Sequence, residues 1–291
     1  MPLNASAVGL TLKPWTTTID ARRLMAYAAG LGHTDDLYFD TTRPTGIINH
    51  PLFPLSPEWD LLTDPDSGMA ALGLTRAETH RGVHAGHDLH LHRTIPADAT
   101  VTVCAEVTGI RRTSAGALIA MRLEGADGDG PLWTTWMDSL YRDVDVDGAD
   151  QVADAAPERP GPPPQSTQSR SGAVRIETWA PHVYGECGRL WNPIHTDLAV
   201  ARAAGLPSVI LHGSATLAHG VDWVLAALGR SPEQVRRVGA SFRAVVPVPS
   251  TIQPTLHTVD TQPDGTSTAH FSVLNGAGNQ AVRDAYVVLN P

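Results

Sequence analysis

The sequence is poor in lysine and in aromatic residues. Lys13 is its single lysine among 291 residues, aromatic residues make up 5% of the chain, and the formal net charge is −9. Nucleic acids and anionic membranes are bound by clustered positive charge, so the composition predicts neither kind of partner. Because aromatic side chains are scarce, we expect a core built mainly from Val, Leu, Ile and Ala.

Cysteine and long hydrophobic runs are also sparse. Cys104 and Cys187 are the two cysteines, which is too few for a disulfide framework. The chain has no run of about 18 apolar residues that could span a bilayer, and its N-terminus lacks the basic and apolar regions of a secretory signal. With 42% hydrophobic and 18% charged residues, the composition predicts a globular, cytoplasmic protein.

A stretch rich in Pro, Gly, Ser, Gln and Asp divides the chain in two. Residues 146–172 show neither helical nor strand periodicity, and we interpret them as a linker. This predicts an N-terminal domain over residues 1–145 and a C-terminal domain over residues 173–291, each of ordinary domain size.

The two halves share a weak internal repeat. An ordered series of matches at nearly constant spacing favours a duplicated domain over chance. The matches at an offset of 157 residues are Tyr27 with Tyr184, Tyr38 with His195 and Asp40 with Asp197; those at an offset of 151 are Pro96 with Pro247, Thr100 with Thr251, Leu123 with Leu274 and Gly125 with Gly276.

Each half combines helical segments with alternating strands. Val101, Val103, Ala105 and Val107 alternate with polar residues, which predicts a half-buried strand. An apolar helix followed by several antiparallel strands favours an α+β fold in which a sheet wraps around a buried helix. We predict helices over residues 20–29, 197–204 and 214–228, and strands over 101–107, 117–123, 133–141, 242–246, 251–259, 268–274 and 281–289.

Residues 184–213 concentrate polar groups suited to carbonyl chemistry. An Asn-Pro-x-His-x-Asp cluster places an amide, Asn192, and an imidazole, His195, just ahead of an alanine-rich helix. Imidazole titrates near neutral pH, which makes His195 a candidate acid/base. A second apolar run follows and ends in His212 and Gly213.

This segment resembles the MaoC-like (R)-specific enoyl-CoA hydratases and dehydratases. Residues 84–96 resemble, more faintly, the strand that follows the central-helix region in the N-terminal copy of double hot dog members. The resemblance implies two hot dog folds in one chain, each a sheet wrapped around a long helix, that together form a pseudo-dimer. The matching positions are Tyr184, Asn192, Pro193, His195, Asp197, Ala201, Gly205, His212 and Gly213.

The resemblance also implies roles for individual residues. In the family, an Asp and a His flank the α,β-carbons of an acyl thioester, and water is added or removed there. Carried over by position, His195 is the acid/base and Asn192 its supporting amide. The N–H of Gly213 is the candidate oxyanion donor, because an unpaired amide at a helix start can stabilise an enolate. Tyr184 is expected to line the substrate site.

The chain departs from the family where the catalytic Asp should stand. That position, two residues before Asn192, is Leu190, which can neither orient water nor carry a proton. Either another acid serves, or the chemistry needs one base, or the site no longer hydrates anything. Glu186 is the nearest upstream carboxylate and a candidate replacement, with a solvated acid as the alternative. Arg189 is a candidate ligand for a substrate carboxylate or phosphate, with an ordinary surface arginine as the alternative.

Other polar residues near the motif have more ordinary interpretations. Asp197 precedes the alanine-rich helix and is predicted to be its N-cap. His212 is predicted to be structural, and Cys187 a small buried thiol rather than a nucleophile. Tyr38 stands where the second copy has His195, so we expect the N-terminal half to form a wall of the acyl pocket rather than a second catalytic site.

Four histidines at positions 84, 87, 90 and 92 invite a metal-site interpretation. On a regular strand, residues 84, 90 and 92 share one face and residue 87 points away, and no Cys or acid completes a ligand set. We therefore predict no metal site and no cofactor.

Taken with the resemblance, the sequence predicts a lyase of the hydratase or dehydratase type. Its substrate would be an α,β-unsaturated or β-hydroxy acyl thioester of fatty acid or polyketide metabolism, carried by CoA or an acyl carrier protein. One alternative is a related lyase, isomerase or conjugate-addition enzyme without hydratase activity. Another is a non-catalytic acyl-thioester binding protein. The candidate assembly is a homodimer.

Overall fold

The computed structural model describes residues 3–154, 156–161 and 169–291. Its helices are α1 (Ala21–Gly30), α2 (Asp36–Phe39), α3 (Leu55–Thr63), α4 (Arg76–Thr79), α5 (Ala180–Gly188), α6 (Leu198–Ala203) and α7 (Gly213–Leu228), with 3-10 turns at Ala5–Ala7, Met69–Leu72, Pro193–His195 and Pro232–Gln234. Its longer strands are β2 (Trp15–Ile19), β3 (Gly82–Leu91), β4 (Ala99–Thr113), β5 (Gly116–Asp127), β6 (Gly130–Arg142), β12 (Val235–Phe242), β14 (Ser250–Thr261), β15 (Ser267–Leu274) and β16 (Gln280–Leu289). The short strands are β1 (Leu3–Asn4), β7 (Val146–Asp147), β8 (Gln151–Val152), β9 (Arg170–Ser171), β10 (Val174–Ile176), β11 (Ile210–Leu211) and β13 (Val246–Pro247).

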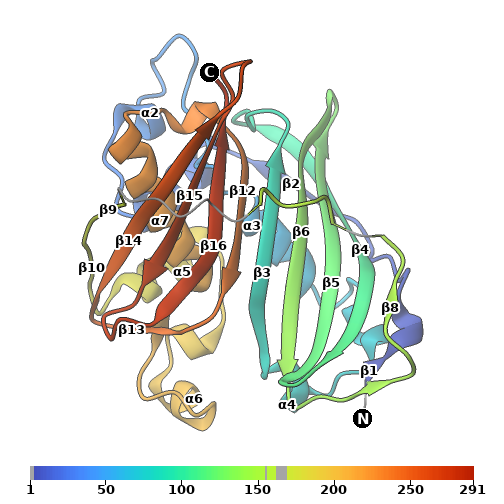
Figure 1. Ribbon diagram of the computed structural model, residues 1–291. Coiled ribbons are helices and arrows are strands. Elements are labelled where there is room, and N and C mark those ends of the chain that lie inside the picture. The colour runs from blue at the N-terminus through green and yellow to red at the C-terminus, as the bar shows by residue number, and fades with distance from the viewer. Residues whose placement is uncertain (1–2, 155, 162–168) are drawn as a thin grey trace.

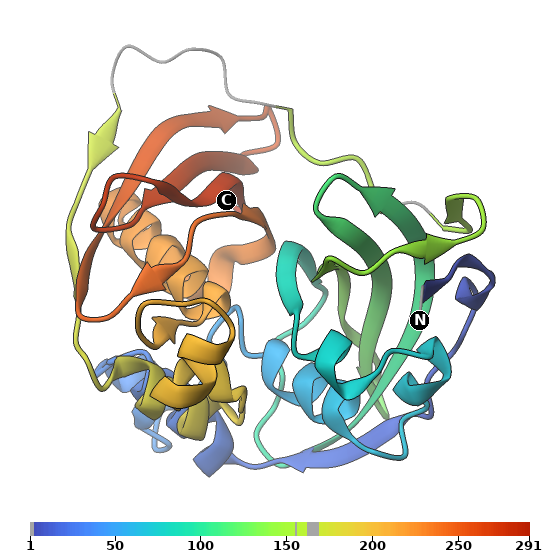
Figure 2. The ribbon, with the colours of Figure 1, turned by 90° about the horizontal axis from the view of Figure 1, so that it is seen from below.

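One sheet of twelve strands runs through both halves of the molecule. Its main path has the order β10-β14-β15-β16-β12-β3-β6-β5-β4-β2, and β9 and β8 pair with β14 and β4. The halves meet where β12 pairs antiparallel with β3. Figure 1 shows the C-terminal strands on one side of this junction and the N-terminal strands on the other. Figure 2 shows each part of the sheet curling around its own helices.

In the C-terminal half the strands wrap around a long apolar helix, as the sequence predicts. The helix α7 is 16 residues long, and most of its side chains are buried. It packs against β14, β15 and β16. It ends at Gly229, whose φ of +64° is a left-handed conformation that glycine adopts without strain.

The central helix of the N-terminal half is shorter than the resemblance implies. Here α3 is 9 residues long and begins directly after Pro54. Proline has no amide donor and a fixed φ, so Pro51 and Pro54 stop the helix from extending toward its N-terminus. The two halves are therefore similar in topology but unequal in their central helices.

The helices α1 and α5 pack against each other across the two halves. They carry one of the repeat pairs predicted from the sequence, because the hydroxyls of Tyr27 and Tyr184 lie 2.9 Å apart. The contact is close because residue 30 is glycine: a Cβ there would lie 2.8 Å from the Cβ of Cys187. The repeat positions therefore meet face to face at the junction.

Most predicted elements are confirmed, but the strand predicted over residues 242–246 is wrong. The strand lies earlier, at Val235–Phe242, and pairs with β3 on one side and β16 on the other. The adjacent arginines at 236 and 237 conceal its alternation in the sequence. Arg237 is tolerated there because it forms a two-pronged ion pair with the buried Asp88 of β3, at 2.7 and 2.8 Å.

The predicted linker contains more structure than its composition indicates. Within residues 146–172, β7 pairs with β1, β8 with β4 and β9 with β14. Residues 155 and 162–168 of this stretch lie outside the described residues. The expectation that the stretch has no strand is therefore wrong, while the division into residues 1–145 and 173–291 stays a prediction.

The predicted faces of the four histidines also need correction. The pairing of β3 with β6 shifts register between His84 and Gly86, which marks a β-bulge. The bulge brings the rings of His84 and His87 within 5.2 Å of each other, although regular alternation would place them on opposite faces.

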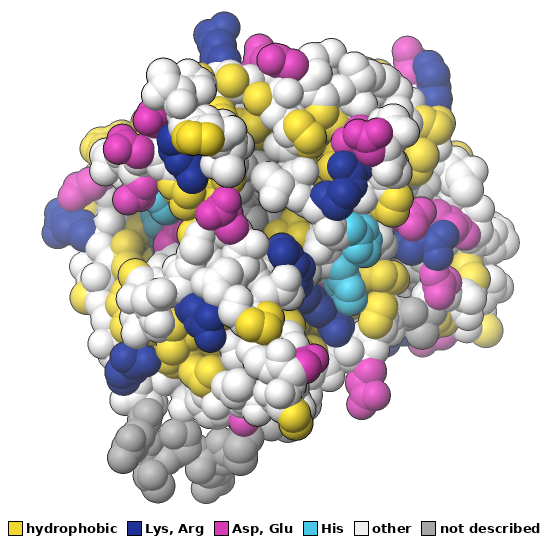
Figure 3. All heavy atoms as spheres, turned by 90° about the horizontal axis from the view of Figure 1, so that it is seen from above, with side chains coloured by type: hydrophobic (Ala, Val, Ile, Leu, Met, Phe, Trp, Pro, Cys, Tyr) yellow, Lys and Arg dark blue, Asp and Glu magenta, His cyan; other side chains and the backbone are white. Residues whose placement is uncertain are grey.

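Two surface features bear on partners. Among the described residues, no helix is both long enough and apolar enough to cross a membrane. On the face shown in Figure 3, basic and acidic side chains are interspersed with hydrophobic ones.

Candidate active site

His195 lies at the end of the 3-10 turn at Pro193–His195 and is only 8% exposed. Its Nδ1 lies 2.9 Å from the carbonyl oxygen of Ile210, so Nδ1 carries the proton and donates it. The Nε2 therefore has a free lone pair, and no described protein group forms a hydrogen bond with it. Burial lowers the pKa of His195 to about 4, although the hydrogen bond to Ile210 acts in the opposite direction. At neutral pH His195 is an uncharged proton acceptor.

His212 forms the other half of a stacked imidazole pair. Its ring lies 3.6 Å from that of His195, with 22° between the planes. Its Nε2 donates to the carbonyl oxygen of Leu190 at 3.0 Å, while its buried Nδ1 has no protein partner among the described residues. Burial, and then the neighbouring His195, hold the pKa of His212 well below its usual value. The pair is uncharged, and His212 helps to fix the plane of His195.

The Gly213 amide begins α7 directly beside this pair. As the first amide of a helix it has no intrahelical acceptor, so it is available to an oxyanion. A Cβ at this position would lie 3.1 Å from a ring carbon of Phe242. Glycine therefore lets the helix start close to β12, and it leaves the amide unshielded by a side chain.

Tyr184 belongs to a buried hydroxyl chain beneath the site. Its hydroxyl lies 2.9 Å from that of Tyr27 and 3.2 Å from that of Ser214, the second residue of α7. The Tyr27 hydroxyl in turn donates to the carbonyl of Leu52. Burial raises the pKa of Tyr184 to about 12. Tyr184 therefore stays protonated, and its hydrogen bonds tie α5 to α7 and to the N-terminal half.

Leu190, which stands where the family has the catalytic Asp, is part of the hydrophobic core. Its side chain is 6% exposed, and a Cβ on Gly188 would lie 3.2 Å from one of its methyl groups. The backbone at position 190 still has a role, because its carbonyl accepts the hydrogen bond of His212. The position contributes packing and an anchor for His212, but no ionisable group.

The other residues predicted for the site lie around this pair. Asn192 is half-buried, and its Oδ1 accepts from the amide of Ile194, so it caps the turn that carries His195.

Glu186 and Arg189 are exposed on α5 and at its end, and neither side chain bonds to a described residue. Glu186 therefore forms no hydrogen bond or ion pair with His195 among the described residues. Asp197 accepts from the amides of Ala199 and Val200, which confirms it as an N-cap.

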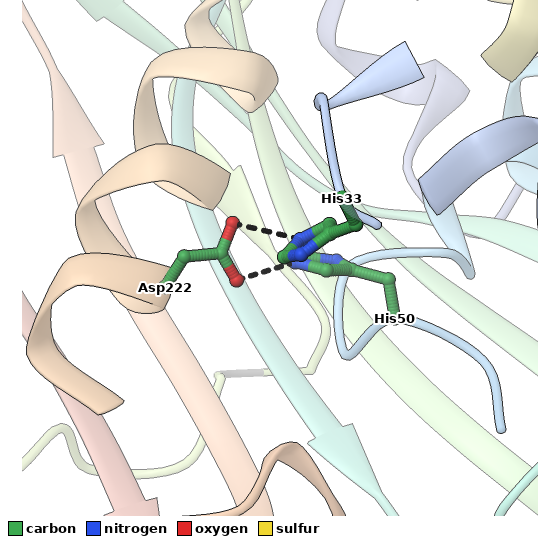
Figure 4. A group of neighbouring side chains, drawn as sticks. All are labelled: His33, His50 and Asp222. Atoms are coloured by element: carbon green, nitrogen blue, oxygen red, sulfur yellow. Dashed lines mark hydrogen bonds and ion pairs between the residues drawn. The ribbon is translucent and has the colours of Figure 1, made fainter. Parts of the chain in front are cut away.

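A group of side chains that the sequence does not reveal joins the two halves. Figure 4 shows Asp222 of α7 directed between His33, which follows α1, and His50, which precedes α3. The carboxylate oxygens lie 3.2 Å from His33 and 3.1 Å from His50. Tyr38, the repeat partner of His195, packs 4.6 Å from the His33 ring. The offset of 157 that aligns these repeat partners also aligns His33 with Leu190, and this signal could have revealed the group.

The ligand atoms of this group lie close enough together to hold a metal ion, but the nitrogen of His50 that faces Asp222 carries a proton. In the part of the chain that the structure describes, it is the only group of three or more His, Cys, Asp or Glu residues whose ligand atoms lie close enough to hold a metal ion. The Nδ1 of His50 accepts from the amide of Leu52 at 3.0 Å, so its Nε2 carries the proton and donates to Asp222. A metal ion would need the lone pair of that same Nε2. The hydrogen bonds therefore fit a proton-linked contact between the halves better than a metal centre.

The fold is that of the double hot dog proteins. A Mycobacterium tuberculosis protein whose solved structure is described as a double hotdog fold aligns over 97% of this chain and 96% of its own, with a TM-score of 0.65 and 16% identity. The structure of a MaoC-like dehydratase from Phytophthora capsici aligns over 96% of this chain and 95% of its own, with a TM-score of 0.78 and 18% identity.

Comparisons of the sequence identify families within this fold. Residues 184–279 match the family model described as MaoC like domain, and residues 6–129 match the model described as FAS1-like, dehydratase domain region. The chain thus carries a MaoC-like domain and a FAS1-like dehydratase region on a double hot dog fold. The 3-hydroxyacyl-thioester dehydratase Y of Mycobacterium tuberculosis is 27% identical over 236 residues, which are 79% of this chain and 78% of that protein.

Proposed function

We propose that this protein is a hydratase or dehydratase of acyl thioesters in which His195 acts as the single acid/base. The observation that carries the proposal is a base beside an oxyanion donor. The base is the uncharged imidazole of His195, whose Nε2 lone pair is free. It stacks on His212, and the next residue, Gly213, supplies the first amide of α7. A base beside an oxyanion donor is what proton transfer at the carbon next to a thioester carbonyl needs. The similarity to a 3-hydroxyacyl-thioester dehydratase supports the same chemistry.

One imidazole is enough for both proton transfers. In the dehydration direction, Nε2 of His195 removes the proton from the α-carbon, and the amide of Gly213 stabilises the resulting enolate oxygen. The imidazolium then gives that proton to the β-hydroxyl, which leaves as water as the enoyl double bond forms. The depressed pKa of His195 makes the imidazolium a strong proton donor in this second step. Hydration follows the same steps in reverse, so Leu190 need not be replaced by another acid.

The remaining parts of the proposal concern the surroundings of the reaction. Asn192 positions His195 by capping its turn. The N-terminal half forms a wall of the acyl pocket, and the thioester is carried by CoA or an acyl carrier protein in the cytoplasm. No cofactor takes part in these steps.

An assay of purified protein with crotonyl-CoA and longer enoyl-CoA thioesters tests the proposal. We expect loss of the enoyl absorbance with the wild type, no turnover with His195→Ala, and unchanged turnover with His182→Ala, a control at an exposed histidine of α5. A wild type that turns over no faster than His195→Ala would show that the hydratase proposal is wrong.

A second candidate function is favoured by the buried, apolar Leu190. A site without the water-binding acid also suits isomerisation or addition of a different nucleophile, or binding of an acyl thioester without chemistry. Mass analysis of the same assay mixtures separates these cases. A product isomeric with the substrate indicates isomerisation, whereas thermal stabilisation by the thioester without any product indicates a binding protein.

A further inference from the structure

Three polar side chains lie between the N-terminal sheet and α3: the buried His87 and Glu58 and the partly buried His84. His87 is fully buried, and neither of its ring nitrogens has a protein partner among the described residues. The same holds for Nε2 of His84 and for Oε2 of Glu58, whose side chain is 1% exposed. Buried polar atoms are almost always hydrogen-bonded, so these atoms favour a ligand that satisfies them.

These atoms lie on one face. His87 and Leu89 are two residues apart on β3 beyond the bulge, so their side chains share a face of the sheet. Leu89 pairs with Thr135 of β6, and the hydroxyl of Thr135 donates to Oε1 of Glu58 on α3. Because α3 covers this face from inside, His87 and Glu58 both belong to the interior between sheet and helix.

The same face connects to the proposed site of chemistry. Gly213 touches Phe242, since a Cβ there would lie 3.1 Å from its ring. The Phe242 ring lies 4.6 Å from that of His84, and the His84 ring lies 5.2 Å from that of His87. The ring of Phe242 therefore links the start of α7, where the thioester carbonyl is proposed to bind, to the two histidines through direct contacts.

The protonation of these groups defines what they can bind. Burial raises the pKa of Glu58 to about 8, although hydrogen bonds from Thr135 and Trp133 oppose this, so Glu58 is a neutral acid at pH 7. Burial lowers the pKa of His84 to about 4, and burial together with the neighbouring His84 lowers that of His87, so both rings are uncharged. Neutral donors and acceptors suit hydroxyl and carbonyl groups, while a saturated hydrocarbon chain would leave them unpaired.

We infer that the acyl chain accepted by the N-terminal half is oxygenated, carrying a hydroxyl or oxo group beyond its reacting carbons. This inference rests on the proposed acyl-thioester function, and it names the substrate class of that function. His87 is the specificity-determining residue, supported by His84 and Glu58. A site built to hydrogen-bond a substrate hydroxyl discriminates strongly against the analogue that lacks it.

Calorimetric binding of inert saturated thioesters tests the inference independently of turnover. The probes are octanoyl-CoA and a set of hydroxyoctanoyl-CoA isomers, each with one hydroxyl beyond carbon 3. For the wild type we expect at least one isomer to bind about tenfold to a hundredfold more tightly than octanoyl-CoA, the ratio that one satisfied buried group gives. The His87→Leu variant should lose this preference, His87→Asn should keep part of it, and the control His80→Leu, at an exposed histidine, should leave it unchanged.

The outcomes separate the two proposals. A wild type that binds octanoyl-CoA as tightly as every hydroxylated isomer overturns the inference, whether or not the His87 variants fold. A preference that His87→Leu leaves intact, with melting temperature showing a folded variant, also overturns it. A preference for a hydroxylated chain in a protein without hydratase turnover supports the inference and refutes only the proposed reaction.

Discussion

Replacing Leu190 with Asp, the acid that the family carries there, should destabilise the protein strongly. The side chain is 6% exposed and packs near Gly188 in the core. Removing a buried leucine forfeits about 2–3 kcal/mol of hydrophobic burial, and an unpaired carboxyl in its place costs about 1–3 kcal/mol more. We therefore expect Leu190→Asp to lower the free energy of unfolding by about 3–6 kcal/mol, which for a chain of this size is a fall of roughly 10 °C in melting temperature.

The pH dependence of this loss has a definite sign. Burial raises the pKa of the new carboxyl above its unfolded value of about 3.9. The folded state then binds more protons than the unfolded state, so stability falls as pH rises above about 4, by up to about 1.4 kcal/mol per pH unit until the folded pKa is passed. The measurement is thermal and urea unfolding of wild type, Leu190→Asp and the volume-conserving control Leu190→Met, which should lose less than about 1.5 kcal/mol. Unfolding of Leu190→Asp within about 1 kcal/mol of the wild type would refute the packing described for this position.

Two further predictions concern charged groups outside the stacked pair. Burial lowers the pKa of His33, but the ion pairs with Asp222 and Asp35 outweigh it and raise that pKa above its unfolded value of about 6.5. The stability that protonated His33 contributes is therefore present below about pH 6.5 and is lost as pH rises through the folded pKa. His50, His219 and Tyr38 lie in the same environment. Melting temperature should therefore fall between about pH 6 and pH 8 more in the wild type than in Asp222→Asn, and equal slopes would contradict the ion pair. Glu186 is exposed and unbonded, so Glu186→Gln should leave kcat and KM of enoyl-CoA hydration unchanged; a loss of about tenfold or more in kcat would instead identify Glu186 as the acid that replaces the family's Asp.

The features that the sequence predicts well depend on local interactions. Asp197 caps α6, as its position before the alanine-rich helix indicates. The buried and exposed residues of β4 alternate as predicted. The place of His195 and Gly213 beside a helix start also follows from the motif, because the whole segment is contiguous in the chain.

The features that the sequence does not reveal depend on partners far away in the chain. The strand β12 is concealed by Arg237, whose charge is neutralised by Asp88 from the other half. The bulge that turns His84 toward His87 arises from pairing with β6. The group of His33, His50 and Asp222 joins three segments, and it would have been visible only by extending the repeat alignment to position 33. The low pKa of His195 likewise comes from burial that no local pattern encodes.

The most direct test of a single-base site is the pH dependence of kcat/KM for enoyl-CoA hydration, measured for the wild type with His195→Ala as reference. Because burial lowers the pKa of His195 to about 4, wild-type kcat/KM should be flat from about pH 6 to pH 8 and should fall only as pH approaches that value. The His195→Ala variant should show no turnover at any pH. Turnover by His195→Ala, or a wild-type profile that falls near neutral pH as a second group titrates, would contradict the account.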